Sequence, residues 1–407
     1  MAGTDPAPRR APRVLLAWEF GAGRSHAAKL AAVGAHLRNA GAECLAALYD
    51  PGAVDTFARH AIPVVQNVVW PARRRAPLAW DARPVRGLGD VLANLGLTRP
   101  DVLAAGIVHY DGLFALFRPD VVVCENAFGA LLAARGHVPA IAFGTTACLP
   151  PRTGEGLALR DDAGGDVPSW PETDVLAGIN EGLIATGRPP LSCLADLLDE
   201  AAAVLPFGPP EFDLFARHRA TPLLPPWLPD MAPPEPSRGA GTEVFAYLHG
   251  FLQQSPQVME SIARLPCPTR LHMPGLSPDW RARIPAHVVV EASPVPPAQI
   301  VARARAVLHH GGQQMTALCL AAGLPQIIVA KEATNVLAGQ LVAARGIGRA
   351  CHVGALTADW IPRTVDAVFA DAAMGARARV AARDYASWFG TDPTRLVAEE
   401  ALALARA

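Results

Sequence analysis

A histidine and glycine turn near residue 310 is the part of this sequence best suited to chemistry. It reads His309, His310, Gly311, Gly312, Gln313, Gln314, Met315 and Thr316. Glycines let the backbone approach a ligand closely, and a helix that begins near Gln313 offers free N–H groups and a positive dipole end. His310 adds a hydrogen-bond donor and Thr316 adds a hydroxyl. The stretch therefore predicts a binding site for an anion such as a diphosphate.

The elements around this turn are typical of a parallel α/β protein. An apolar strand over 306–309 precedes the turn, Gly323 ends the helix, and Pro325 leads into a strand over 326–329. Short apolar runs alternate with Ala- and Leu-rich helical stretches along the chain, which predicts strands joined by helices. The other predicted strands lie at 14–18, 45–48, 121–124, 140–143, 244–248, 269–272 and 288–290.

The first predicted helix follows a glycine-rich turn at 21–25. Ser25 is expected to cap this helix and Gly41 to end it. Its apolar face is expected to consist of Ala28, Leu30, Ala31, Val33, Leu37 and Ala40.

The densest proline cluster, within 205–240, divides the two series of strands and predicts a domain boundary. We expect two Rossmann-like domains, over 1–220 and 241–385, joined by a Pro-rich linker at 221–240. A final helix over 386–407 can pack back on the first domain. Two open parallel sheets of this kind place ligands at the carboxyl ends of their strands, facing one another across a cleft. Two facing ligands indicate a transferase.

The composition narrows the choice of partner. The 407 residues carry a formal charge of -1 and only 18% are charged, which disfavours a nucleic-acid groove or a polybasic membrane surface. The chain has two lysines, Lys29 and Lys331, beside 34 arginines. Seven widely spaced cysteines indicate a reducing compartment, and no apolar run has the length of a membrane span. These features predict a cytoplasmic protein whose partners are small molecules.

With its flanking strands, the turn resembles the donor motif of GT-B glycosyltransferases, in particular the family 1 enzymes that use nucleoside-diphosphate sugars. The shared residues are His310, Gly311, Gly312, Thr316, Gly323, Pro325 and Gln326. The tandem histidines look closest to bacterial enzymes of natural-product biosynthesis that use deoxysugars carried on thymidine diphosphate. The resemblance implies a donor of the UDP or TDP type, bound by these residues together with Gln313 and Gln314.

The motif also departs from the family. Leu318 stands where many members have a ribose-binding Glu, and Thr334-Asn335 replaces a sugar-binding Asp-Gln pair. Asn335 can still reach a sugar hydroxyl. Lys331 can pair with a phosphate or with a carboxylate on the sugar, and a plain surface lysine is the alternative.

A second resemblance lies in the N-terminal half. Residues 18–30 look like a variant of the family's Glu-Leu-Gly-x-Gly-x-Gly-His segment, which places His26 at the acceptor-side histidine. Residues 118–134 resemble its Pro-Asp strand, with Glu125 in place of the acidic residue that orients the histidine. The resemblance covers nearly the whole chain. It implies that His26 is the general base and that Glu125 fixes its tautomer, and packing or helix capping is the alternative for His26.

Further residues are assigned to the acceptor side. Gly23 lies in the turn before His26, and Lys29 lies one helical turn after it. Lys29 either contacts an acidic acceptor or is a solvated helix lysine. His109 lies on a helical stretch at 101–117, where a packing role is the alternative. The basic cluster at 73–75 leaves a peptide or acidic acceptor open beside a solvated loop.

The sequence thus predicts an inverting, metal-independent glycosyltransferase without a cofactor, which transfers a sugar from a nucleotide sugar to a small-molecule or peptide acceptor. No Asp-x-Asp occurs in a strand-end loop, and GT-B enzymes carry the leaving diphosphate on a helix end and side chains. Two alternatives remain. One is a non-catalytic homologue that binds or activates a partner enzyme, and the other is a GT-B cleft reused for a different coupling with an altered donor.

Overall fold

The computed structural model describes residues 10–21, 24–70, 86–154, 156–158, 168–228 and 241–407. It divides into two compact units. Unit 1 comprises Met1–Phe207, Phe215–Leu224 and Pro393–Ala407, and unit 2 comprises Gly208–Leu214 and Pro225–Asp392. The division lies near the predicted boundary, but the chain crosses it more than once. Gly23, the basic cluster at 73–75 and most of the predicted linker lie outside the described residues.

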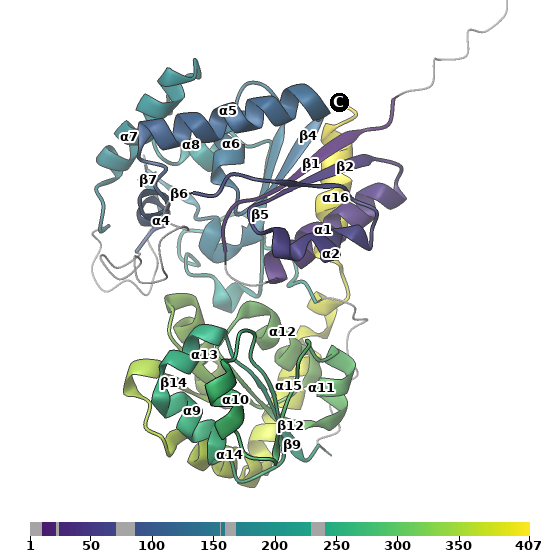
Figure 1. Ribbon diagram of the computed structural model, residues 1–407, viewed down its shortest axis with the longest axis vertical. Helices are drawn as coiled ribbons and strands as arrows, with labels where there is room; N and C mark the ends of the chain where they lie inside the picture. Colours follow the sequence, from purple (N-terminus) through teal and green to yellow (C-terminus); the bar gives the residue numbers. More distant parts are fainter. Residues whose placement is uncertain (1–9, 22–23, 71–85, 155, 159–167, 229–240) are drawn as a thin grey trace, which may run out of the picture. The chain divides into compact units, whose positions relative to one another are not determined.

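Unit 1 is built on a six-stranded parallel sheet with the order β3-β2-β1-β4-β5-β8. Its strands are β1 (Arg13–Trp18), β2 (Glu43–Leu48), β3 (Val64–Gln66), β4 (Val121–Glu125), β5 (Ala140–Thr145) and β8 (Ala203–Phe207). Its helices are α1 (Ser25–Asn39), α2 (Val54–Ala58), α4 (Leu88–Leu95), α5 (Pro100–Phe117), α6 (Phe128–Ala134), α7 (Glu172–Ala185), α8 (Asp196–Asp199) and α16 (Pro393–Leu404). A short hairpin joins β6 (Arg152–Thr153) and β7 (Gly156–Leu157). Figure 1 shows helices on both faces of this sheet.

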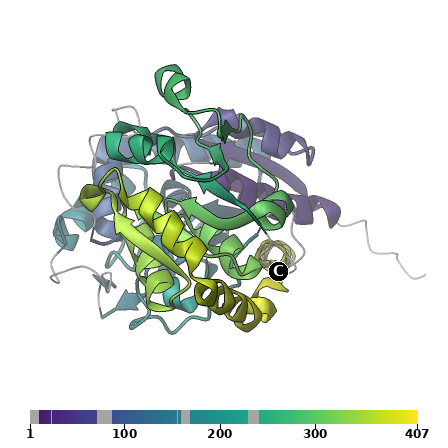
Figure 2. The same ribbon diagram turned by 90° about the horizontal axis from the view of Figure 1, so that it is seen from below.

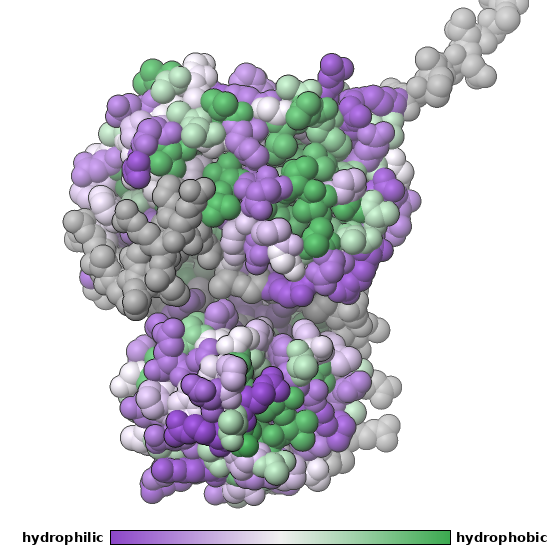
Figure 3. Space-filling view, viewed as in Figure 1, coloured by the Kyte–Doolittle hydropathy of each residue, from purple (hydrophilic) through white to green (hydrophobic). Residues whose placement is uncertain are grey.

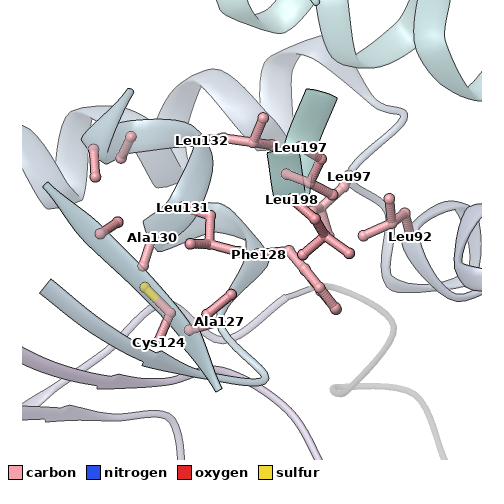
Figure 4. Close-up of a cluster of buried hydrophobic side chains, with 14 of the residues drawn as sticks. Leu92, Leu97, Cys124, Ala127, Phe128, Ala130, Leu131, Leu132, Leu197 and Leu198 are labelled. Atoms are coloured by element: carbon pink, nitrogen blue, oxygen red, sulfur yellow. The ribbon is translucent and has the colours of Figure 1, made fainter. Parts of the chain in front are cut away.

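Alternate residues of each strand supply the two cores of unit 1. Leu15 and Val122 belong to one buried cluster, whereas Leu16 and Val123 belong to the other. In the first cluster, the side chains of α6 pack with Cys124 and with leucines from α4 and α8 (Figure 4). The second cluster includes Val397, Ala398, Ala401 and Leu402 of α16, which packs against α1. The last helix of the chain therefore completes the core of unit 1.

Unit 2 repeats the same topology, with the strand order β11-β10-β9-β12-β13-β14. Its strands are β9 (Glu243–Tyr247), β10 (Thr269–His272), β11 (Val288–Val290), β12 (Ala304–His309), β13 (Gln326–Ala330) and β14 (Gly348–His352). Its helices are α9 (Pro256–Ala263), α10 (Pro278–Arg283), α11 (Pro297–Arg303), α12 (Gln313–Ala322), α13 (Ala333–Ala344), α14 (Trp360–Ala370) and α15 (Ala372–Phe389). Figure 2 shows this sheet flanked by its helices from below. Both sheets have the strand order of a Rossmann fold, which confirms the predicted fold class.

The structure corrects two details of the first predicted helix. Ser25 is the first residue of α1 and caps nothing, because the N-cap position belongs to Arg24 and no side chain bonds there. Ala40 is exposed, while Ala27 and Lys29 are buried. Gly41 follows the helix with a positive φ of 85°, as its predicted role requires.

Two observations concern the hydrophobic residues of the described chain: the apolarity of its helices and the hydropathy of its surface. Among the described residues, no single helix has the length and apolarity needed to cross a membrane. Helices α4 and α5 have the required length and apolarity only when they are taken together, and the chain bends by 87° at the break between them. On the face shown in Figure 3, hydrophobic side chains gather in groups on each unit, with hydrophilic side chains around them.

Candidate active site

The first candidate site lies where the strand order of the unit 1 sheet reverses, between β1 and β4. In a doubly wound sheet, ligands bind outside the carboxyl ends of the strands at this point. Trp18 ends β1 and is paired in register with Glu125, which ends β4. The turn after β1 leads into α1 and places His26 in its first turn, against the same sheet edge. The topology thus brings together two residues that are 99 positions apart in the sequence.

His26 and Glu125 form a close pair. The Nδ1 of His26 lies 2.8 Å from Oε1 and 2.9 Å from Oε2 of Glu125. A carboxylate in this position receives the Nδ1 proton, so the Nε2 lone pair is free to accept one. The Glu125 side chain is fully buried, whereas that of His26 is 14% exposed. The imidazole is therefore anchored on one side and accessible on the other, as a general base requires.

Gly21 makes room for the second nitrogen of His26. A Cβ at Gly21 would lie 2.5 Å from Nε2, and the backbone there has a φ of 117°. Its carbonyl oxygen accepts a hydrogen bond from the Tyr49 hydroxyl. Trp18 stacks on the imidazole with its ring centroid 6.0 Å away. A larger residue at position 21 would displace the imidazole from this position.

Lys29 is the unexpected member of this site. Its Nζ lies 3.0 Å from Oε1 of Glu125, and its side chain is only 4% exposed. The nitrogen also lies 4.4 Å from the ring centroid of Phe207. The expectation of a solvated helix lysine is thus wrong, because the ammonium is buried against the carboxylate. The assignment of Lys29 to the acceptor side stays a prediction. The signal in the sequence was the spacing of three residues from His26, which places both on one helix face.

The charge of Glu125 depends on these two neighbours. Burial by itself raises the pKa of this carboxyl, but the charges of His26 and Lys29 and their hydrogen bonds lower it to about 2. Glu125 is therefore ionised at neutral pH. Asn126 adds its amide nitrogen 3.3 Å from Nδ1 of His26 and has a positive φ of 47°.

A second buried carboxylate, Glu19, supports the turn that carries Glu125. The N–H groups of Gly129 and Ala130 donate to Glu19 at 2.9 and 2.8 Å, so this carboxylate occupies the N-terminus of α6. Tyr110 and Trp70 donate to it as well, at 2.7 and 3.0 Å. Burial raises the pKa of Glu19 although all four hydrogen bonds oppose this. No role was predicted for Glu19, because its partners lie up to 111 residues away in the sequence.

His109 has its contacts with residues other than His26 and Glu125. It lies on α5 and stacks edge-on against Tyr110, with ring centroids 5.7 Å apart. Its Nε2 is buried without a hydrogen-bond partner, and burial lowers its pKa. These contacts are those of a packing residue, the alternative given above. Through Tyr110 it borders the Glu19 network.

The second candidate site occupies the equivalent position in unit 2, between β9 and β12. Gly311 has a positive φ of 87°, and a Cβ there would lie 2.9 Å from the Asn335 carbonyl oxygen. The turn therefore requires glycine and rests on the first turn of α13. Gly312 is the N-cap of α12, which begins at Gln313 as predicted, and Gly323 follows this helix in the left-handed conformation.

The two tandem histidines have different surroundings. The Gly311 N–H donates to Nδ1 of His309 at 3.1 Å, so its Nε2 carries the proton and donates to Oε1 of Gln326 at 3.0 Å. Burial and the neighbouring His310 lower the pKa of His309 to about 3. His309 is therefore a neutral group that holds the turn in place. Nδ1 of His310 is buried without a partner, and burial, together with His249, lowers the pKa of His310 to about 4.

Aromatic residues at neighbouring strand ends surround His310. Tyr247 ends β9 and lies 5.4 Å from His310 and 5.7 Å from His272 between ring centroids. His249 lies 6.0 Å from His310, and its Nδ1 accepts a hydrogen bond from the Phe251 N–H. Burial lowers the pKa of His249 too. The sequence analysis gave no site role to Tyr247 or His249. A usable signal was that Tyr247 lies near the end of the predicted strand 244–248 and that His249 directly follows it.

The other residues predicted to bind the sugar-nucleotide donor have three kinds of surroundings. Gln313 and Gln314 are half-buried at the start of α12. The Thr316 hydroxyl donates to the Gly312 carbonyl oxygen at 3.0 Å, and its contact with a diphosphate stays a prediction. Asn335 is buried in α13, and Lys331 is exposed with its Nζ 5.0 Å from the Phe251 ring centroid.

Leu318 belongs to the core of unit 2. It is 4% exposed and packs in a cluster with Phe245 and Ile300. Its substitution for the family's Glu is therefore compatible with an apolar environment. Among the residues that the structure describes, no group of three or more His, Cys, Asp or Glu side chains is placed to hold a metal ion.

Comparison with known proteins identifies the fold. Residues 256–400 match the family described as erythromycin biosynthesis protein CIII-like, C-terminal domain. The calicheamicin glycosyltransferase CalG4 is 22% identical, with a TM-score of 0.67 over 97% of this chain and 98% of that chain. The glycosyltransferase VinC, in complex with DTDP, is 18% identical, with a TM-score of 0.65 over 97% and 99%. The chain has the GT-B glycosyltransferase fold.

A third solved structure agrees with this assignment. SnogD from Streptomyces nogalater is 17% identical, with a TM-score of 0.64 over 97% of this chain and 100% of that chain. A comparison with curated protein sequences finds no match. The resemblance to GT-B glycosyltransferases and the fold class predicted from the sequence are confirmed.

Proposed function

We propose that this protein is an inverting glycosyltransferase that transfers a sugar from a UDP- or TDP-type nucleotide sugar to a small-molecule or peptide acceptor. The observation that carries the proposal is the His26–Glu125 pair, whose imidazole is bound to a buried carboxylate on one side and accessible on the other. Support at the level of the fold comes from glycosyltransferases, one of which was solved with DTDP.

His26 acts as the general base of this reaction. Its Nε2 takes the proton of an acceptor hydroxyl while that oxygen forms a bond to the anomeric carbon of the sugar. The bond from this carbon to the diphosphate oxygen breaks on the opposite face, so the configuration inverts. Glu125 holds the Nδ1 proton and stabilises the imidazolium that forms.

The turn after β12 receives the diphosphate. The N–H groups at the start of α12, close to Gly311 and Gly312, face the leaving group together with the positive end of the helix dipole. His310 is neutral at pH 7, so it contributes a hydrogen bond and no net charge. Lys331 and Asn335 lie at the adjacent strand end and helix, where they can contact the sugar. This mechanism uses no metal ion.

The proposal is tested by a transfer assay with purified protein, a panel of TDP and UDP sugars, and aglycone acceptors. Release of nucleoside diphosphate with formation of a glycoside supports it. His26→Ala should reduce kcat by about 10²–10⁴-fold, the usual contribution of a general base, and leave the nucleotide Kd unchanged. His60→Ala, at an exposed histidine of the same unit, is the matched control.

Two outcomes would decide against this mechanism. Unchanged turnover in His26→Ala would remove His26 from the reaction. Titration calorimetry that shows no binding of any nucleotide or nucleotide sugar would favour a non-catalytic partner protein instead.

A further inference from the structure

We propose that Lys29 is a positioning residue that shares the Glu125 carboxylate with His26 and so offsets the negative charge that this carboxylate presents to the imidazole. The inference rests on the base role proposed above for His26 and assigns a separate function to a buried lysine.

One carboxylate serves two nitrogen groups in this site. Oε1 of Glu125 lies 2.8 Å from Nδ1 of His26 and 3.0 Å from Nζ of Lys29. The Glu125 side chain has no exposed surface, and that of Lys29 is 4% exposed. The three groups therefore interact in a poorly hydrated environment, where charges act on one another more strongly than at the surface.

The fold fixes Lys29 in this place. It lies one turn after His26 on α1, so both side chains reach the end of β4 from the same helix. The Phe207 ring, at the end of β8, lies 4.4 Å from its Nζ. The ammonium is thus held between a carboxylate and an aromatic ring, both of which favour its charged form.

The charge balance around His26 follows from these contacts. Without Lys29, the single negative charge of Glu125 would be available to stabilise an imidazolium. With Lys29, a positive charge beside the same carboxylate disfavours that second cation. Lys29 thereby offsets the preference of the Glu125 carboxylate for a charged imidazole.

Other groups near His26 carry no competing charge. The Tyr49 hydroxyl is bonded to the Gly21 carbonyl oxygen, and Asn126 contributes a neutral amide. Burial raises the pKa of Cys148 to about 11, so its thiol is neutral. Arg24, just before α1, is paired with Asp55. Among the described residues, the charged groups of this site are therefore Glu125, which contacts His26, and Lys29, which contacts Glu125.

The test uses the scarcity of lysine in this chain. Because there are two lysines, protein labelled with nitrogen-15 in its lysine side chains gives two ammonium signals, from Lys29 and from the exposed Lys331. His26 is followed in the same samples by imidazole NMR and assigned by its loss in His26→Asn. We expect the Lys29 signal to shift with the same midpoint as His26, whereas Lys331 does not respond to it.

Substitution supplies the second measurement. In Lys29→Met, the midpoint of the His26 titration should move to higher pH by about one unit or more, as removal of a nearby like charge predicts. The acid limb of kcat/KM should move by the same amount. Lys29→Arg keeps the charge and should leave both in place. Circular dichroism establishes that each variant is folded.

Two results would overturn the inference. One is a folded Lys29→Met protein whose His26 midpoint does not move. If Lys29→Met does not fold, the NMR titration of the protein without substitutions is the test. A Lys29 signal that does not change as His26 titrates would then reject the proposal. The NMR midpoints need no substrate, so a shift without any transferase activity would reject the base role of His26 and retain the coupling to Lys29.

Discussion

The two units have the same strand order, but they place opposite kinds of side chain at the same point of the sheet. In unit 1, Trp18 ends the first strand and its register partner is the ionised Glu125. In unit 2, Tyr247 ends the equivalent strand and its register partner is the neutral His309. One fold therefore supports a site built on buried charges and another built on neutral hydrogen-bonding groups.

This difference between the two sites matches the charge of the species that each site is proposed to stabilise. A base must gain a positive charge during the reaction, and Glu125 is already in place to stabilise it. A diphosphate brings its own negative charge, so backbone N–H groups and neutral imidazoles suffice. The near-zero net charge of the chain is consistent with an anion site made without a basic patch.

The largest expected effect comes from removal of the charge in unit 1. Glu125→Gln should lower kcat by roughly 10²–10³-fold, because the amide cannot stabilise the imidazolium. Nucleotide binding by unit 2 should not change. Steady-state kinetics and calorimetry measure the two quantities. Equal losses in kcat and in nucleotide affinity would mean that the variant has lost its fold, which circular dichroism would reveal.

Acid should affect unit 2 before unit 1. Unfolded histidines bind protons below pH 6.5, but His310 and His309 in the folded unit do so only near pH 4 and 3. Each therefore removes roughly 1 kcal/mol of stability per pH unit below 6.5. The stability that Glu125 contributes is present above its unfolded pKa of 4.5 and is lost as pH falls toward 2, by about 3 kcal/mol in total.

Hydrogen exchange at pH 7 and pH 5.5 measures this difference for each unit. Peptides from the sheet of unit 2 should lose protection at pH 5.5, while those from the sheet of unit 1 keep it. His109 in unit 1 is shifted in the same direction, but it is only partly buried and should act more weakly. Equal loss of protection in both units would contradict the contrast between them.

A smaller effect is expected from closing the space at the turn of unit 2. Gly311→Ala introduces a Cβ at a positive φ and within 3.0 Å of Asn335, which should cost about 2–4 kcal/mol. Gly275→Ala is the control, because Gly275 has a similar φ of 73° with nothing within 4 Å of its Cβ, and should cost about 1–2 kcal/mol. Urea unfolding measures stability, and calorimetry should show weaker nucleotide binding for Gly311→Ala alone.

The smallest expected effect concerns the network around Glu19. Tyr110→Phe removes one of the four hydrogen bonds to this carboxylate and should cost about 1–2 kcal/mol of stability. Because the backbone bonds from Gly129 and Ala130 remain, kcat should stay near that of the unaltered protein. Urea unfolding with parallel kinetics checks both. A large loss of kcat would show that the network does more than support α6.

Most of the fold could be predicted, and the strands that could not are of one kind. Most of the predicted strands are central ones with apolar runs, which a parallel sheet buries on both faces, although the three-residue edge strand β11 was predicted as well. In the two parallel sheets, the missed strands β3, β8 and β14 all lie at sheet edges. Pro206 within β8 is tolerated because an edge strand has a free side, so the proline cluster concealed a strand.

The candidate sites divide in a similar way. His26, Glu125, Gly311 and the start of α12 were predicted because they lie in local motifs with a recognisable order. Glu19 and His249 were missed because their roles depend on partners brought in by other strands and helices. Lys29 was assigned to a solvated or acceptor-contacting role because sequence spacing gives the helix face, but not what that face packs against.

The sequence by itself determined the alternation of strands and helices, the glycines that the turns require, and the residue types with useful chemistry. These are local properties, fixed by backbone sterics and by the period of the apolar pattern. The tertiary structure alone decided which of these side chains contact the same charged group. Glu125 contacts both His26 and Lys29 because β4 lies beside β1. In this buried site, the contacts with His26 and Lys29 keep the Glu125 carboxyl ionised.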